Sequence, residues 1–217
     1  MDPQPDIDPY LEAAAQKGMR ITHIFETHVQ ADHLSGARRL AAVTSAPIIY
    51  HESARVRFPH VGVADGEVHE LGNVRVTALH TPGHTPESMC LLVADRTRAP
   101  EPWFVLTGDT LFSGGVGRPD LLGAGAEAAL AEQLHESLFG KLLELPDHIE
   151  IFPAHFSGAA CGKGLSGKAG TTIGFERRFN LALQFRAKEA FVNFVLADLP
   201  PEPAEFALNR LRNLGVV

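Results

Sequence analysis

Residues 26–36 constrain this chain more than any other stretch, with the sequence Glu-Thr-His-Val-Gln-Ala-Asp-His-Leu-Ser-Gly. Three residues that can bind a metal, His28, Asp32 and His33, lie here between a strand-like run and a helix-like run. Imidazole and carboxylate groups are donors that zinc and iron accept in proteins. The pattern predicts a metal-binding loop, and the alternative is a polar turn that only caps the next helix.

Size and charge limit the classes of protein that fit. A chain of 217 residues with 45% hydrophobic content can bury a core, and we expect one domain, 1–217, whose C-terminal part from about 174 is helical. The net charge of −7 argues against a nucleic-acid partner and favours a small-molecule substrate. Two cysteines suit a reducing compartment. Without a membrane-spanning run or a signal-like start, we expect a cytoplasmic protein with no membrane partner.

Four predicted strands are each followed by a residue that can bind a metal. The strands are short apolar runs at residues 20–25, 74–79, 103–106 and 149–152. The residues that follow them are His28, His84, Asp109 and His155. Loops at strand ends converge on one rim of a sheet, so side chains far apart in the sequence can meet there. The sequence therefore predicts one site for a divalent metal.

Helices alternate irregularly with these strands. Asp8 and Pro9 predict the N-cap and first turn of a short helix. Gly72-Asn73 predicts the turn of a hairpin between two extended runs. Apolar residues at helical spacing predict further helices at residues 35–43, 126–139, 179–190 and 189–199. The fold class is α/β.

The combined pattern resembles the signature of the metallo-β-lactamase superfamily, T-H-x-H-x-D-H followed by a distant histidine, an aspartate and a last histidine. The matching residues are Thr27, His28, Asp32, His33, His84, Asp109 and His155. The resemblance covers nearly the whole chain and implies an αββα sandwich with metals at one edge between the sheets. Members usually begin with strands before the segment that here reads Asp2-Pro3-Gln4. We therefore expect the first strands to be absent or the sequence to be truncated, and an exposed sheet edge that favours a homodimer.

Gln30 stands where the signature has its second histidine. In dinuclear hydrolases of the superfamily, the matching positions would form one site from His28, position 30, His84 and Asp109. The other site would be formed by Asp32, His33, Asp109 and His155. A glutamine offers only a neutral amide oxygen, so the first site keeps two histidines and one carboxylate, which is the facial triad of non-heme Fe(II) oxygenases.

The persulfide dioxygenase branch of the superfamily is similar. It implies that His28, His84 and Asp109 bind one Fe(II). The substrates would be O2 and glutathione persulfide or a related low-molecular-weight persulfide, and the products would be sulfite and the thiol. Asp32, His33 and His155 would then hydrogen-bond ligands and bound water instead of holding a second ion. One alternative is a Zn²⁺-dependent thioester hydrolase of the hydroxyacylglutathione hydrolase type, in which the metal lowers the pKa of water. A non-catalytic metal-binding or thiol-binding domain is the other.

Two further segments resemble substrate-binding parts of persulfide dioxygenases. Gly117-Arg118-Pro119-Asp120 matches their G-R-x-D stretch. Arg118, beside Asp120, would then make a bidentate hydrogen-bonded pair with a carboxylate of the thiol. The alternative is a surface arginine in a turn. Residues 158–163 match the G-x-x-C-G-K loop of rhodanese-fused members. Cys161 would contact the persulfide, or be an inert small residue, and Lys163 would contact an anionic group. The remaining histidines match no signature position, and we expect surface or structural roles for them.

Overall fold

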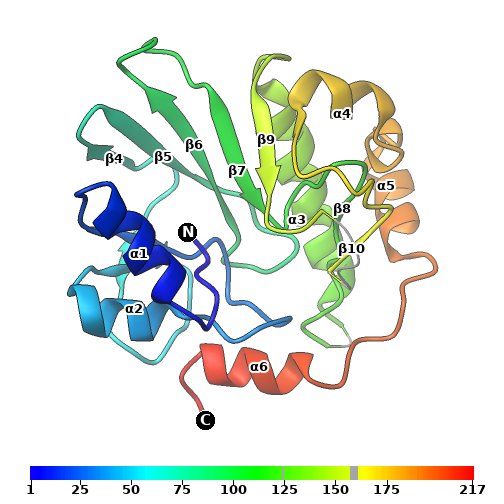
Figure 1. Cartoon of the computed structure of the whole chain (residues 1–217). Coiled ribbons are helices and arrows are strands. Elements are labelled where there is room, and N and C mark those ends of the chain that lie inside the picture. The colour runs from blue at the N-terminus through cyan, green and yellow to red at the C-terminus, as the bar shows by residue number, and fades with distance from the viewer. Residues whose placement is uncertain (124, 157–160) are drawn as a thin grey trace.

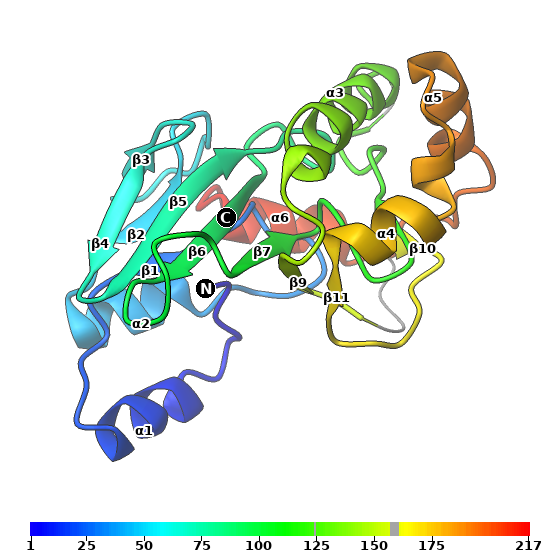
Figure 2. The ribbon, with the colours of Figure 1, turned by 90° about the horizontal axis from the view of Figure 1, so that it is seen from above.

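The computed structural model describes residues 1–123, 125–156 and 161–217, without the side chain of Lys163. Two main sheets lie between two layers of helices (Figures 1 and 2), and β8 (Val116–Gly117) and β10 (Gly162–Lys163) form a separate two-stranded sheet. The larger sheet has the order β11 (Thr171–Thr172), β9 (Glu150–Pro153), β7 (Phe104–Gly108), β6 (Met89–Asp95), β5 (Val74–His80) and β4 (Val68–Leu71). The smaller, parallel sheet has the order β1 (Ile24–Phe25), β2 (Ile48–His51) and β3 (Val61–Val63). This is the αββα arrangement expected from the sequence.

The helices cover the outer faces of the two sheets. Figure 1 shows α1 (Asp8–Gln16) and α2 (Ala37–Thr44) on one side of the strands. On the other side lie α3 (Glu127–Gly140), α4 (Ile173–Phe179) and α5 (Lys188–Leu196). The last helix, α6 (Phe206–Asn213), crosses beneath both sheets. Short 3₁₀ turns cover Leu142–Glu144 and Ala182–Gln184. Every helix of the described residues is too short or too polar to cross a membrane.

Alternation along the strands separates the hydrophobic core into layers. In β6, Met89 and Leu91 point toward Phe25 and Ile49 of the smaller sheet, whereas Cys90 joins the cluster packed against α3 and α5. Successive side chains of a strand face opposite sides of a sheet, so a buried strand needs apolar residues on both faces. The larger sheet is therefore packed on both faces. This packing fixes the position of the sheet and also the positions of its strand ends.

Several predicted boundaries were wrong. Ile7, not Asp8, occupies the N-cap of α1, and no side chain caps it. The predicted helix at 179–190 is absent: α4 ends at Phe179, and Asn180 is extended with φ −71° and ψ 120°. Helix α4 starts at Ile173, before the predicted helix, because Thr172 forms its N-cap. The Thr172 hydroxyl accepts the Phe175 N–H at 3.2 Å. Apolar residues at helical spacing in 179–190 belong instead to a 3₁₀ turn and to the start of α5.

The outer strand of the smaller sheet contacts the start of the chain. The Phe25 carbonyl oxygen, on the side of β1 away from β2, accepts the Asp2 N–H at 2.9 Å. The Pro3 carbonyl oxygen in turn accepts the Gly36 N–H at 2.8 Å. Residues 2 and 3 thus fix both ends of the loop that follows β1.

Candidate metal centre

Loops after β1, β5 and β7 bring three possible ligands together. Donor atoms of His28, His84 and Asp109 all lie within 4.8 Å of one another. The Nε2 atoms of His28 and His84 are 3.8 Å and 3.5 Å from Asp109 Oδ2, and the two imidazole rings are nearly perpendicular at 85°. All three side chains are at most 2% exposed. The cluster is two imidazoles and one carboxylate converging in a buried site.

The chemistry of this cluster fits a divalent cation. Neither carboxylate oxygen of Asp109 has a hydrogen-bond partner, although both are buried. Burial, and then the nearby Asp32 carboxylate, raise the pKa of Asp109 well above its usual value. Burial lowers the pKa of His28 and that of His84, the latter to about 4, so both imidazoles are neutral near pH 7. An unpaired buried carboxylate is costly, and a bound cation would remove this cost while neutral imidazoles supply lone pairs.

Hydrogen bonds fix the tautomers of both histidines. The Nδ1–H of His84 donates to the Arg118 carbonyl oxygen at 2.9 Å. The Thr27 hydroxyl donates to Asp2 Oδ2 at 3.0 Å, so it accepts from His28 Nδ1, also at 3.0 Å. In each ring Nε2 is left with its lone pair toward Asp109. Thr27, a residue of the signature, and Asp2, which the sequence analysis did not select as a site residue, therefore orient His28.

Two glycines allow close approach around Asp109. Gly108 has φ +51°, and a Cβ there would lie 2.6 Å from the Thr27 hydroxyl. A Cβ at Gly117, in β8 (Val116–Gly117), would lie 1.9 Å from the Asp109 carbonyl oxygen and 3.1 Å from His84 Cβ. Side chains at either position would push the ligand-bearing segments apart. The backbone at both positions therefore needs glycine.

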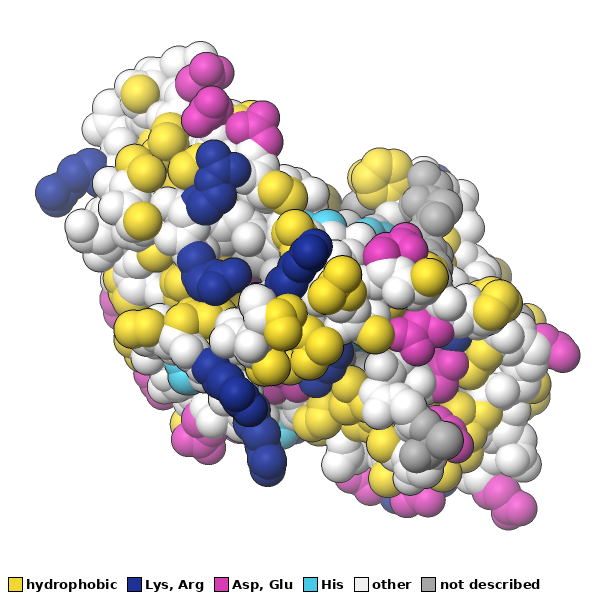
Figure 3. Space-filling view, turned by 90° about the horizontal axis from the view of Figure 1, so that it is seen from below, with side chains coloured by type: hydrophobic (Ala, Val, Ile, Leu, Met, Phe, Trp, Pro, Cys, Tyr) yellow, Lys and Arg dark blue, Asp and Glu magenta, His cyan; other side chains and the backbone are white. Residues whose placement is uncertain are grey.

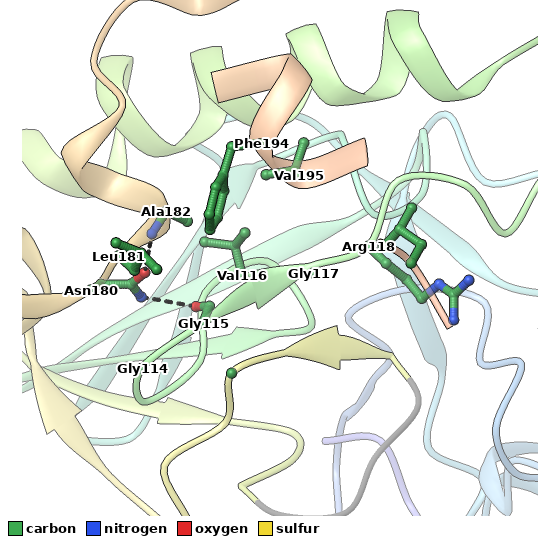
Figure 4. Close-up of a pocket in the computed structure, with 12 residues that line it drawn as sticks. Gly114, Gly115, Val116, Gly117, Arg118, Asn180, Leu181, Ala182, Phe194 and Val195 are labelled. Carbon is green, nitrogen blue, oxygen red and sulfur yellow. Dashed lines mark hydrogen bonds between the residues drawn. The ribbon is translucent and has the colours of Figure 1, made fainter. Parts of the chain in front are cut away.

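A cavity of about 240 Å³ lies beside β8. Figure 4 shows Val116, Phe194 and Val195 around it, with the Arg118 guanidinium some way off to one side. The residues that line it include neither His28, His84 nor Asp109. The cavity is therefore distinct from the metal centre.

Asp32 and His155 lie beside the first cluster. His155 Nε2 is 3.3 Å from Asp32 Oδ2 and 3.4 Å from Asp109 Oδ1. His33 Nδ1 is 3.0 Å from Asp32 Oδ1. Burial opposes ionisation of Asp32, but the hydrogen bond and charge of His33, with His155, lower its pKa to about 2. A carboxylate that stays ionised thus faces two imidazoles at the rim of the centre.

Two of the predicted substrate-binding residues, Arg118 and Cys161, are buried. Arg118 is 3% exposed, and its Nε and Nη2 donate to the two Asp120 oxygens, each at 2.7 Å. Nη2 also donates to the Pro200 carbonyl oxygen at 2.7 Å. Cys161, 1% exposed, accepts the Arg118 backbone N–H at 3.0 Å. The Lys163 side chain and residues 157–160 lie outside the described part of the chain.

Helix α6 supplies contacts that the sequence analysis did not identify. Asn213 Nδ2 donates to the carbonyl oxygens of Gln30 and His33 at 2.9 Å and 2.8 Å. Asn213 Oδ1 accepts the Ser35 N–H at 3.0 Å. Asn209, one turn earlier, donates to the Ala31 carbonyl oxygen at 3.1 Å. These bonds span more than 170 positions and join side chains to backbone, so no residue pattern could have indicated them.

Basic side chains gather on the face that carries α6 (Figure 3). Arg38, Arg57 and Arg212 are exposed. Arg38 Nη2 donates to the Arg212 carbonyl oxygen at 3.2 Å, and the Arg57 N–H donates to the Leu214 carbonyl oxygen, just after α6, at 2.7 Å. Arg210 is partly buried, with Nη1 3.8 Å from Glu87 Oε1 and without a hydrogen bond. Glu87 in turn accepts the Val29 N–H at 3.1 Å. A chain with a net negative charge thus keeps positive charge beside the metal loop.

The fold and site define an αββα protein with a buried histidine–carboxylate centre suited to a metal. The family model of the metallo-beta-lactamase superfamily matches residues 2–155, and the chain belongs to this superfamily. It is 35% identical over 153 residues to a hydroxyacylglutathione hydrolase of Maricaulis maris, a match that covers 70% of this chain. The match covers 54% of the hydrolase, so the chain spans about half of that relative's length.

Two solved structures share the fold over the whole chain. A metallo-beta-lactamase from Staphylococcus aureus has a TM-score of 0.92 and 32% identity, and the match covers 100% of this chain and 64% of that one. ETHE1 from Myxococcus xanthus has a TM-score of 0.83 and 28% identity, with coverage of 100% and 87%. The metallo-β-lactamase fold expected from the sequence is confirmed.

Proposed function

We propose that this protein is a mononuclear Fe(II) persulfide dioxygenase that oxidises glutathione persulfide or a related low-molecular-weight persulfide. The observation that carries the proposal is the donor set: His28, His84 and Asp109 converge, and the fourth position of that site is Gln30. Two histidines and one carboxylate leave coordination positions open for O2 and a substrate sulfur. The reaction takes up O2 and water and releases sulfite, thiol and protons.

The residues of the chain have separate tasks in this proposal. Ferrous iron on the triad would supply the activation of O2. Thr27 and the Arg118 carbonyl oxygen hold the two imidazoles in the tautomer that binds metal. Asp32, kept ionised beside His33 and His155, would hydrogen-bond ligands and bound water together with these two histidines. Burial of the triad keeps bulk water out of the site.

Positive charge around the site favours an anionic thiol. Arg38, Arg57 and Arg212 are exposed beside the end of α6 and would attract carboxylates of glutathione. Arg118 is held by Asp120 and Pro200, so it orients the thiol only if a substrate carboxylate replaces Asp120. Cys161 and Lys163 are proposed to complete the thiol site. A small molecule is the proposed partner, and a homodimer is the proposed assembly.

The second candidate is a Zn²⁺-dependent hydrolase of glutathione thioesters. The relative from Maricaulis maris, a hydroxyacylglutathione hydrolase by name, favours it. In this reading Asp32, His33 and His155 bind a second ion, and a metal-lowered water pKa supplies hydroxide. Gln30 argues against it, because a neutral amide oxygen is a poor ligand for the first zinc. A metal-binding domain without catalysis is the remaining alternative.

One pair of assays separates the candidates. Anaerobically iron-loaded protein is expected to consume O2 with glutathione persulfide and to form sulfite, while the zinc-loaded protein leaves a glutathione thioester intact. No O2 uptake at full iron occupancy, together with thioester cleavage by the zinc form, would reject the dioxygenase. Absence of both activities at full occupancy of either metal would leave only the metal-binding domain.

A further inference from the structure

The cavity beside β8 has an apolar wall that is held open by packing. Side chains of β8, α5 and the segment after α4 form this wall: Val116, Leu181, Ala182, Phe194, Val195 and Leu199. Phe194 stacks on Phe185 with ring centroids 4.5 Å apart. Val116 and Val195 belong to the largest buried cluster of the core. Side chains packed in this way keep the space between them open.

The polar groups of the wall have protein partners. Asn180 Nδ2 donates to the Gly115 carbonyl oxygen at 3.0 Å, and Asn180 Oδ1 accepts the Ala182 N–H at 3.1 Å. The Arg118 guanidinium donates to both Asp120 oxygens and lies to one side of the cavity (Figure 4). A buried water needs several polar partners, and these groups have already formed their hydrogen bonds. The wall therefore favours an apolar occupant over water.

The size of the cavity suits a small molecule. Its volume is about 240 Å³. Apolar cavities of about 150 Å³ stay dry and bind benzene or xenon. Molecular oxygen is also apolar and is smaller than benzene, so it fits the same kind of space.

One strand contacts both the cavity and the metal centre. Gly117 of β8 lines the cavity. A Cβ at Gly117 would lie 1.9 Å from the Asp109 carbonyl oxygen and 3.1 Å from His84 Cβ, so the same residue also packs against two ligand-bearing segments. An apolar molecule in the cavity is therefore one strand away from the metal centre.

We propose that this cavity is a binding site for small apolar molecules and that it holds O2 beside the metal centre. The first part stands on the lining, whereas the role of O2 rests on the proposed dioxygenase function. O2 dissolves better in apolar media than in water, so an apolar cavity raises its concentration next to the site. Such binding lowers the KM for O2 without changing kcat.

Xenon is the probe for the binding site, because it is apolar and unreactive. The zinc-loaded protein, which is diamagnetic, is expected to show saturable shifts of the amide NMR signals of residues 114–117 under xenon pressure. Val195→Phe fills the cavity from α5 and should lose these shifts, and the smaller filling in Val195→Leu should reduce them. Val192→Phe adds the same bulk one turn earlier on α5, away from the lining residues that the structure describes, and should keep them. Circular dichroism shows whether each variant is folded.

The role of O2 is tested with iron-loaded protein at saturating persulfide. Val195→Phe is expected to raise the KM for O2 about threefold or more with kcat nearly unchanged, as loss of uniform binding requires. Val192→Phe should keep the KM of wild type.

Each part of the proposal has its own contrary result. Absence of saturable xenon shifts in wild type would overturn the binding site. Loss of the xenon shifts in Val195→Phe with an unchanged KM for O2 would overturn the role of the cavity in holding O2. No O2 uptake by wild type would reject the dioxygenase and the role of O2 with it, and xenon binding in the same protein would still support the apolar site.

Discussion

Gln30 is 1% exposed, and neither atom of its amide has a hydrogen-bond partner. We predict that Gln30→His binds iron more tightly and lowers the rate of O2 uptake with persulfide about tenfold or more, equivalent to about 1.4 kcal/mol. An imidazole here would occupy a coordination position that O2 or the persulfide needs. Iron content and kcat measured on the same preparation check this. Gln30→Asn is the control that keeps a neutral amide, and a full rate in Gln30→His would contradict the prediction.

His51 and His80 stack with ring centroids 3.6 Å apart and an interplanar angle of 6°. Burial, and then His80, lower the pKa of His51 to about 4; Asp65 opposes this and Lys141 adds to it. The unfolded chain binds this proton near pH 6.5. Between pH 6.5 and 4 the unfolded state therefore binds more protons, so the contribution of His51 to stability is complete above pH 6.5 and is lost as pH falls.

We predict that His51→Asn is less stable than wild type at pH 7.5, and that the difference shrinks as pH falls from 6.5 to 4.5. Asparagine can still accept the Ser53 N–H, which His51 Nδ1 accepts at 3.3 Å, but it does not titrate. Urea unfolding at several pH values measures the two curves. Parallel curves would contradict the prediction, since other groups titrate equally in both proteins.

The sequence indicated some site residues and not others, for a physical reason. His28, His84, Asp109 and His155 could be selected because each follows an apolar strand and has a side chain that can bind a metal. Within the described part of the chain, the Asn213 side chain hydrogen-bonds to backbone atoms of the metal loop, and almost any loop sequence offers those atoms. The positions of strand ends follow from local patterns, whereas side-chain contacts to backbone depend on the complete fold.

At the level of elements, α6 supplies the metal loop with the backbone hydrogen bonds that a neighbouring strand would supply in a sheet. Asn209 and Asn213 are four positions apart and so lie on one face of the helix. That face satisfies the backbone of Gln30, Ala31, His33 and Ser35, which belong to no strand or helix. A loop that holds a metal ligand needs such partners, because an unpaired buried carbonyl or N–H group is costly.

We predict that Asn213→Ala destabilises the protein by about 3 kcal/mol, because three backbone groups lose their partners. Asn209→Ala, which removes one bond, should cost about 1 kcal/mol. A positioning role requires more than lost stability: the visible spectrum of cobalt bound at the first site should change in Asn213→Ala and stay unchanged in Asn209→Ala. Equal spectra in both variants would reduce Asn213 to a structural residue.

Short strands explain most of the elements that the sequence did not predict. β8, β10 and β11 have two residues each and β3 has three, too few to display alternation. β8 and β10 nevertheless bring Gly117 against Asp109 and Cys161 against Arg118. Strands β5 and β7 and helix α3 lie close to their predicted ranges because their apolar runs are longer.

On the scale of the whole molecule, the metal centre joins the two sheets. His28 follows β1 of the smaller sheet, whereas His84 and Asp109 follow β5 and β7 of the larger one. Between the sheets the core is apolar, with Phe25, Ile49 and Met89 among its residues. The order of layers was predictable from the motif, but the pairing within the smaller sheet was not, since β3 carries no periodic pattern.

An ion on the triad therefore acts as a cross-link between the layers. We predict that removing the metal lowers the Tm, because an ion that binds only the folded state stabilises it by about 4 kcal/mol at a thousand times its Kd. Hydrogen exchange should accelerate at β1 and at the end of β7, and α5, remote from both ligand loops, should change little. His84→Ala is the matched control: it should melt at the same temperature with and without chelator. A chelator-sensitive Tm in His84→Ala would show that the stabilising ion lies elsewhere, and an unchanged Tm in wild type would show that core packing alone holds the sheets together.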